Sequence, residues 1–292
     1  MSVRIVSLIP SGTDIACALG LGASIVGISH ECDHPEVAGL PIVTSSVIDS
    51  SLPPAQIDTD VNTAVEAGQS LYITNRELLR ELNPDVVLTQ TICDVCAVNS
   101  QTARASLPPN AKLINLSATS FAGLWDDLRE VAHATGTDAE PLIAELQQRL
   151  QAVQDRAEGR EKPRVLVVEW TEPPFLGGHW VPEMIELAGG THVLSGAGEA
   201  SRRARWDEIR EAHPEIVILA PCGYDLQQTQ QQGRAIKNEL CSLNVRAIWV
   251  TNATALFSRC TPASVRGVEV VAGMLWPDFA SPCSSEAVPL EL

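Results

Sequence analysis

The chain has 292 residues, which at roughly 150 residues per domain predicts about two domains with a sizeable core. Hydrophobic residues make up 45% and charged residues 19%, a balance typical of a folded globular protein rather than a disordered one. With 36 acidic and 20 basic residues the formal net charge is −16, so we expect no binding to nucleic acid or to anionic membranes.

The first residues do not form a recognisable secretion signal. Such a signal has a basic region, about 7–15 apolar residues and a small-residue cleavage site. Here the apolar run from Val3 ends at Ile9, before Pro10-Ser11-Gly12, as a buried strand does when it enters a helix. No apolar run approaches the ~18 residues of a membrane span. We therefore expect a cytoplasmic protein, whose eight cysteines are thiols, metal ligands or redox groups rather than structural disulfides.

Strands and helices alternate along the first part of the chain. Short apolar runs predict strands at 3–8, 25–28, 85–88 and 112–116. Helices are predicted at 11–19, 75–82 and 121–135. The stretch 44–72 has weak periodicity and two adjacent prolines, and we interpret it as irregular.

A long helix is predicted at 139–158, where leucines and a valine recur at helical spacing. It lacks Pro and Gly from Leu142 to Glu158, so it should be rigid and about 30 Å long. The alternation then resumes. Strands are predicted at 164–168, 216–219 and 247–250, with helices at 182–187, 227–240 and 262–275.

This order predicts an α/β fold of two Rossmann-like lobes joined by one long rigid interlobe helix. The expected boundaries are an N-terminal lobe at 1–120, a helical connection at 121–162, a C-terminal lobe at 163–279 and a flexible tail at 280–292. A faint repeat links the lobes, because 83–90, with Cys93 shortly after it, and 213–222, which ends at Cys222, each have a Pro, a buried strand and then a Cys-bearing loop. Ligands of open parallel sheets bind beyond the carboxyl ends of the strands, so we expect both loops to line one cleft.

Two cysteine-containing segments are candidate metal sites. His30, Glu31, Cys32 and His34 lie together after the second strand, and imidazole and thiolate are ligands of zinc. Cys93 and Cys96 form a single C-x-x-C, which suits half a zinc site, a redox pair or an iron–sulfur corner. The predicted ligand set is Cys32, Cys93, Cys96 and Cys222. The alternatives are a polar loop and reduced thiols lining a pocket, and Cys17, Cys241 and Cys260 are interpreted as packing residues.

An aromatic loop follows the first strand of the second lobe. It contains Glu169, Trp170 and Phe175, and then Gly178, His179 and Trp180. Glycine lets a ligand approach the backbone, and the rings offer flat apolar area for a large planar ligand. The alternative is that both tryptophans pack in the core.

The opening run 4–14 (RIVSLIPSGTD), with Gly27-Ile28-Ser29 and the strand 82–87 (LNPDVV), resembles the cobalamin and ferric-siderophore substrate-binding proteins of ABC importers. The resemblance spans about residues 3–276 and implies the class III substrate-binding-protein fold. The cysteine-rich and Gly178–Glu183 segments resemble a subgroup without export signals, often labelled cobalamin-binding protein. The family docks onto its permease through one Glu on each lobe. Glu77 lies at the first such position and Asp207 or Glu208 near the second, although a cytoplasmic receptor could not reach an importer's outer face.

We therefore expect a binding protein, not an enzyme, for a small-molecule metal chelate such as cobalamin, another tetrapyrrole or an iron chelate. The predicted ligand-binding residues are Ser11, Thr13, His30, Glu31, Tyr72, Gln90, Glu169, Trp170, Phe175, Gly178, His179, Trp180, Tyr224, Phe257 and Arg259. The alternative is a metalloprotein or enzyme with zinc or an iron–sulfur cluster on the cleft cysteines and Glu31 or Glu169 as an acid–base group.

Overall fold

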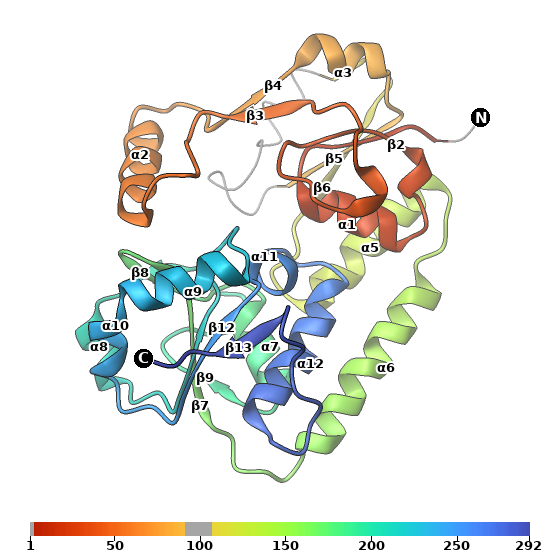
Figure 1. Cartoon of the computed structure of the whole chain (residues 1–292). Helices are drawn as coiled ribbons and strands as arrows, with labels where there is room; N and C mark the ends of the chain where they lie inside the picture. Colours follow the sequence, from red (N-terminus) through yellow and green to blue (C-terminus); the bar gives the residue numbers. More distant parts are fainter. Residues whose placement is uncertain (1–2, 91–106) are drawn as a thin grey trace. The chain divides into compact units, whose positions relative to one another are not determined.

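A computed structural model describes residues 3–90 and 107–292 (Figure 1). The chain folds into two compact units. Unit 1 comprises Met1–Ala118 and Ala122–Ala144, and unit 2 comprises Thr119–Phe121 and Glu145–Leu292. Helix α6 (Glu140–Ala157) is therefore divided between them. None of the helices in the described ranges combines the length and the apolar character needed to cross a bilayer.

Unit 1 is built on a four-stranded parallel sheet in the order β2-β1-β5-β6. Its strands are β1 (Ile5–Ser7), β2 (Ile25–Ile28), β5 (Val86–Gln90) and β6 (Lys112–Leu116), with a separate antiparallel pair of β3 (Thr44–Ser46) and β4 (Tyr72–Thr74). Its helical segments are α1 (Pro10–Ala18), η1 (Gly22–Ser24), η2 (Pro35–Val37), α2 (Pro54–Glu66), α3 (Arg76–Leu82), α5 (Phe121–Thr135) and the start of α6. Strands β1 and β5 are almost fully buried, as expected for inner strands of a parallel sheet.

Unit 2 contains a seven-stranded sheet with the path β10-β8-β7-β11-β12-β13, and β9 pairs with β7. Its strands are β7 (Arg164–Thr171), β8 (Pro174–Leu176), β9 (Thr191–His192), β10 (Arg202–Arg203), β11 (Ile216–Leu219), β12 (Ala247–Thr251) and β13 (Ala287–Pro289). Its helices, besides α6, are α7 (Val181–Leu187), α8 (Trp206–Glu211), α9 (Leu226–Ala235), α10 (Lys237–Cys241), α11 (Ala253–Leu256) and α12 (Ala263–Leu275). β7, β11 and β12 are parallel to one another. β8 pairs antiparallel with β7, β10 with β8, and β13 with β12.

The α/β class predicted from the alternating pattern is confirmed, and most predicted elements lie within a few residues of those observed. The segment 44–72 is the main exception, because it contains β3, α2 and β4. The two prolines begin α2 instead of preventing it, since Pro54 occupies its first turn. Only two residues of α2 are buried, which explains its weak hydrophobic periodicity.

Two predicted elements in unit 2 also differ. The helix expected at 227–240 is two helices, α9 and α10, which meet at Ile236. The segment 280–292, expected to be a flexible tail, contains β13, which pairs antiparallel with β12.

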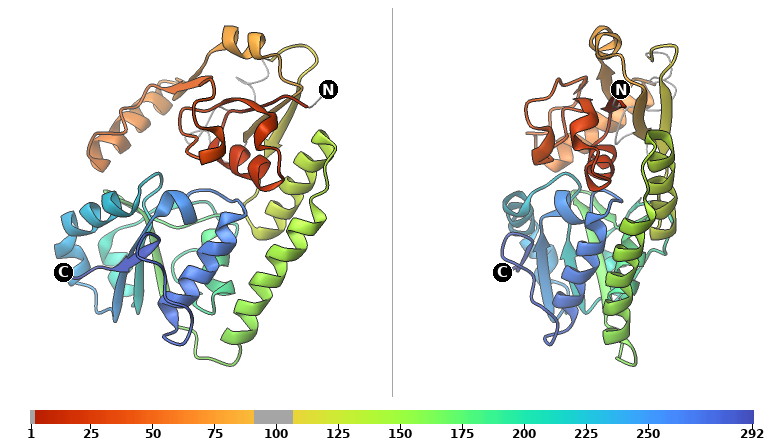
Figure 2. Two further views of the ribbon diagram at one scale, coloured as in Figure 1. Left: turned by 45° about the vertical axis from the view of Figure 1, so that its right-hand side comes forward. Right: turned by 90° about the vertical axis from the view of Figure 1, so that its right-hand side faces the viewer.

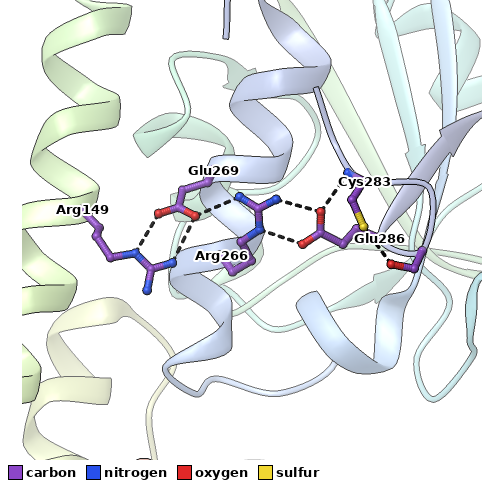
Figure 3. A network of polar contacts seen from close by, with 6 residues as sticks. Arg149, Arg266, Glu269, Cys283 and Glu286 are labelled. Atoms are coloured by element: carbon purple, nitrogen blue, oxygen red, sulfur yellow. Dashed lines mark hydrogen bonds and ion pairs between the residues drawn. The ribbon is translucent and has the colours of Figure 1, made fainter. Parts of the chain in front are cut away.

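A chain of ion pairs anchors the segment before β13 (Figure 3). Arg149 on α6 donates to Glu269 on α12 at 2.8 and 3.1 Å. Arg266, one turn from Glu269, also donates to Glu286 at 2.7 and 2.8 Å, and Glu286 accepts the backbone N–H of Cys283 at 3.0 Å. α6 and α12 lie side by side in both views of Figure 2. The network thus ties three segments of unit 2 that are far apart in the sequence.

Candidate functional site

The end of β7 and the loops that follow β11 and β12 meet at the carboxyl edge of the unit 2 sheet. The carbonyl of Glu169 accepts the N–H of Cys222 at 3.0 Å. Gly223 donates its N–H to the Ser258 hydroxyl at 3.1 Å, and the carbonyl of Tyr224 accepts an N–H from the start of α11. The end of β7 and these two loops therefore form one hydrogen-bonded surface, at the edge where α/β proteins place ligands.

Aromatic side chains gather on this edge. The rings of Trp170 and Tyr224 meet edge to face with centroids 5.5 Å apart. Trp180 donates its indole N–H to the carbonyl of Phe257 at 3.0 Å, and its ring stacks on His179 at 5.9 Å. Both tryptophans are only half-buried, whereas the Phe257 ring is 3% exposed and belongs to the core. We call Trp170, His179, Trp180 and Tyr224 the aromatic edge.

Glu169 lies beneath this surface. Its carboxylate accepts the N–H of Gly178 at 3.4 Å and a hydrogen bond from Ser201. Burial nevertheless raises the pKa of Glu169 above its ordinary value. A Cβ on Gly178 would lie 2.3 Å from the backbone nitrogen of Ser201, so only glycine fits there. The glycine predicted to admit a ligand therefore admits the backbone of a neighbouring segment.

His179 has an unusual conformation for a side-chain-bearing residue, with a φ of 53°. Its Nδ1 is buried and has no hydrogen-bond partner among the described residues. Burial also lowers the pKa of His179, so the imidazole is neutral near pH 7. A neutral imidazole has a lone pair for a metal or a proton donor.

The carboxyl edge of the unit 1 sheet is polar instead. The Nδ1 atom of His30 lies 2.7 Å from the hydroxyl of Thr44, which donates to Ser29 at 3.1 Å. The ring of Tyr72 lies 5.9 Å from the His30 ring, and burial lowers the pKa of His30. A carboxylate oxygen of Glu31 lies 3.9 Å from Nε2 of His30. Thr44, the first residue of β3, thus contacts His30. It was not predicted as a site residue, because 44–72 was expected to be irregular.

Other predicted residues of unit 1 take different positions. Thr13 is fully buried, and its hydroxyl lies 3.0 Å from the sulfur of Cys32. Ser11 is in the first turn of α1, and Gln90 is the last residue of β5. Near them, Asp127 of α5 holds the loop after β6 by accepting the N–H groups of Ser117 and Ala118 at 3.0–3.1 Å.

In unit 2, Phe175 lies on β8 under the guanidinium of Arg203, 5.5 Å from the ring centroid. Arg259 follows α11 and is partly exposed. Ser201 and Ser258, which bond Glu169 and Gly223, were not predicted. No local signal marks either serine, because each contacts a residue more than thirty positions away.

The predicted cysteine site falls partly outside the described residues, since Cys93 and Cys96 lie there. Cys32 belongs to unit 1 and Cys222 to unit 2. Neither forms a disulfide, nor do the four other cysteines in the described ranges: Cys17, Cys241, Cys260 and Cys283. Cys17 and Cys260 are buried, but Cys241 is exposed, so its interpretation as a packing residue is wrong. It ends the polar helix α10.

The predicted docking carboxylates begin two helices. Glu77 is exposed in the first turn of α3. In the first turn of α8, Asp207 pairs with Arg210 and Glu208 pairs with Arg202 at 2.5 Å. The α8 carboxylates thus already have arginine partners within their own unit.

Comparisons with known proteins agree with this architecture. The family model described as "Periplasmic binding protein" matches residues 5–242. The vitamin B12-binding protein of Vibrio cholerae is 23% identical over 282 residues, covering 92% of this chain and 87% of that protein. Solved structures with the same fold include the periplasmic vitamin B12 binding protein BtuF of V. cholerae (TM-score 0.69, 19% identity, 93% and 96% of the two chains). A periplasmic heme binding protein of Pseudomonas aeruginosa gives a TM-score of 0.73 at 17% identity over 100% and 99%.

Two expectations are decided by these comparisons. The matched family consists of binding proteins, which confirms the prediction of a binding protein and not an enzyme. The expected cytoplasmic location is wrong, because the relatives are periplasmic and point away from it. That expectation rested on a strand beginning near Val3, and an early strand reports the fold of the segment, not the compartment of the protein.

Proposed function

We propose, from the premise that this chain belongs to the periplasmic binding protein family, that it binds a bulky metal chelate. The ligand class is a corrinoid such as vitamin B12, another tetrapyrrole or an iron chelate. Relatives of the same fold carry names of vitamin B12- and heme-binding proteins. The observation that carries the proposal is the aromatic edge of unit 2, where Trp170 meets Tyr224 and the half-buried Trp180 stacks on a neutral histidine.

The aromatic edge suits a large, mostly apolar ring system. Trp170 and Trp180 each have one polar atom and a broad apolar face, so they can contact a macrocycle while keeping the indole N–H bonded to protein. In Trp180 that N–H is already satisfied by Phe257, which leaves the ring for contact. His179 would supply a nitrogen lone pair to the metal or to a polar substituent of the chelate.

The remaining predicted ligand residues are part of this proposal. In unit 1, His30 and Tyr72 lie at the polar edge with their rings 5.9 Å apart. His30 carries a buried Nε2 that lacks a hydrogen-bond partner among the described residues. A ligand substituent that bonded this nitrogen would offset its desolvation.

Cyanocobalamin and hemin, added separately to the purified protein, test the proposal. We expect at least one to change its visible absorption and quench tryptophan fluorescence. Trp180→Ala and Trp170→Ala should each weaken that binding about tenfold or more, the effect of losing about 1.4 kcal/mol of ring contact. Trp276→Phe is the control. Trp276 follows α12 and donates its indole N–H to the carbonyl of Ala188, which follows α7, so it is not part of the aromatic edge. Binding that is unchanged in both alanine variants would refute this site.

We also propose that the protein delivers its ligand to an ABC importer through Glu77 and the carboxylates of α8. Glu77→Lys should leave chelate affinity unchanged but lower ligand-stimulated ATP hydrolysis by the reconstituted importer. Asp207→Lys should have a smaller effect, because the carboxylate already pairs with Arg210. Unchanged ATP hydrolysis in both variants would remove the docking role while leaving the chelate proposal intact.

A further inference from the structure

Three side chains of different chemistry converge in unit 1 where α1 ends. Cys17 is in the last turn of α1, and His34 and Glu36 lie on either side of Pro35 at η2. One ligand atom from each lies within 4.8 Å of the other two. Within the described ranges, no other group of three His, Cys, Asp or Glu side chains meets this spacing.

The layout of the cluster gives access from one side. The Cys17 thiol is buried beneath, whereas His34 is half-exposed and Glu36 exposed. A Cβ on Gly22 would lie 2.1 Å from Oε2 of Glu36, so the missing side chain lets this carboxylate lie over the end of α1. An ion could therefore approach from solvent past the imidazole and the carboxylate to reach the thiol.

We propose that Cys17, His34 and Glu36 form a binding site for a divalent transition-metal ion of the zinc type. Thiolate, imidazole and carboxylate are the three ligand types of zinc proteins, at about 2.0–2.3 Å from the ion. Three protein ligands leave the fourth tetrahedral position to water. This set differs from the predicted set of Cys32, Cys93, Cys96 and Cys222, which was expected to converge from loops of both lobes.

Electrostatics around Cys17 favour a cation. Burial raises the pKa of Cys17 to about 11, and the negative charges of Glu36 and Asp14 add to the effect. When the ion binds, the thiol releases its proton to solvent and a metal–sulfur bond replaces the S–H bond. The ion then balances the thiolate and the Glu36 carboxylate, so the repulsion that opposes ionisation becomes attraction.

Binding requires a small rearrangement. Tetrahedral ligands at these bond lengths lie roughly 3.3–3.8 Å apart, so the three donors must draw closer. His34 accepts the N–H of Glu36 at Nδ1, at 3.3 Å. A neutral imidazole has one lone pair, so this weak bond is lost on ligation.

Titration of the purified full chain with Co²⁺, without any chelate, tests the site. A thiolate bound to cobalt gives a sulfur-to-metal charge-transfer absorption, and we expect this band at one ion per chain. His34→Ala and Glu36→Gln change surface residues and should weaken cobalt binding about tenfold or more. Cys17→Ser should abolish the band, and Zn²⁺ should displace the cobalt.

Cys32→Ser and Cys241→Ser are the matched controls. Cys32 is the neighbouring thiol and lies against Thr13, and Cys241 is an exposed thiol of unit 2. Both variants should keep the band. Its absence from the wild type, its persistence at full affinity in both surface variants, or its loss in Cys32→Ser would overturn the proposal. Because no chelate is present, none of these outcomes depends on the proposed function.

Discussion

Each unit starts its sheet with the same arrangement of groups. In unit 1, the Arg4 guanidinium donates to the carbonyl of Leu82 at the end of α3, and the Arg4 N–H donates to Asp85 at 2.8 Å. In unit 2, the Arg164 guanidinium donates to carbonyls at the end of α8, and the Arg164 N–H donates to Glu215, also at 2.8 Å. This arrangement of an arginine, a helix end and a carboxylate, which we call the corner, therefore occurs twice in the chain.

The backbone of the two corners matches as well. Asn83 and His213 both end a helical segment in the left-handed region, at φ values of 42° and 45°. The carbonyl of Asp85 accepts the N–H of Lys112, the first residue of β6, and the carbonyl of Glu215 accepts the N–H of Arg246, the residue before β12, both at 2.8 Å.

The opposite, carboxyl edges are unlike each other. Unit 1 presents His30 among hydroxyl groups, whereas unit 2 presents half-buried aromatic rings over a carboxylate. The repeated corner is thus scaffold, and the differing edges hold the proposed ligand-binding residues. The following predictions test that division, beginning with the largest expected effect.

Glycines at the two edges should differ in their tolerance of a side chain. In unit 2, Gly178→Ala places a Cβ 2.3–2.8 Å from backbone atoms of Ala200 and Ser201, which cannot move independently. We expect a loss of about 3 kcal/mol in unfolding free energy by urea denaturation, together with weaker chelate binding. In unit 1, Gly12→Ala meets the Ser7 and Leu88 side chains at 2.7 and 2.9 Å, and should cost less.

Gly196→Ala is the control, since its nearest neighbour is the flexible end of Glu199 at 3.3 Å. A Gly178→Ala protein as stable as this control would show that the unit 2 edge is more adaptable than its packing indicates.

Asp127 gives unit 1 a pH dependence of its own. Burial raises the pKa of Asp127 from 3.8 to about 6. The folded state therefore holds this proton more tightly than the unfolded state, and stability falls as pH rises from about 4 to about 6. The expected loss is about 2–3 kcal/mol, and Asp127→Asn should be free of it. Urea unfolding of both proteins between pH 4 and 7.5 measures the difference; parallel curves would contradict the assignment.

Arg266 has no counterpart among the corner residues. Replacing it with Ala leaves Glu269 with Arg149 alone and Glu286 without its guanidinium partner. Since these groups are partly buried, we expect a loss of about 1–2 kcal/mol and faster amide exchange in β13. Arg129→Ala, which breaks a solvent-exposed pair with Glu140, should cost clearly less than Arg266→Ala. Equal losses in the two variants would mean that the network adds nothing beyond a surface pair.

The two corner arginines should give the smallest and most nearly equal effects. Arg4→Ala and Arg164→Ala each remove side-chain hydrogen bonds to exposed helix-end carbonyls, which we expect to cost about 1 kcal/mol. Unfolding curves of the two variants should agree within about 0.5 kcal/mol. A clear inequality would show that the corners, though alike in geometry, support their units differently.

One part of the corner, the proline and the strand after it, was visible in the sequence as a repeat because its signal is local. Pro84 and Pro214 each precede an apolar strand, and the repeat between 83–90 and 213–222 corresponds to β5 and β11. The exposed helix α2 was missed because it buries too little to leave a hydrophobic pattern.

The candidate sites were harder to predict, since they depend on distant pairs. Trp170 and Tyr224 were both predicted, but their contact depends on the adjacency of β7 and β11. Thr44 reaches His30 through β3, and Ser201 reaches Glu169 from a loop 32 positions away. Periodicity identifies elements, but it does not show which loop covers which strand.

The outermost position of β13 affects how this protein avoids aggregation. An open sheet edge offers N–H and C=O groups to a strand from another molecule. β13 covers β12, and Leu290 donates its N–H inward to Ile248 at 2.8 Å. Alternation then turns the nitrogen of Pro289 away from the sheet, where a proline has no proton to offer an incoming strand. The last strand therefore ends the sheet and also makes its new edge a poor template for self-association.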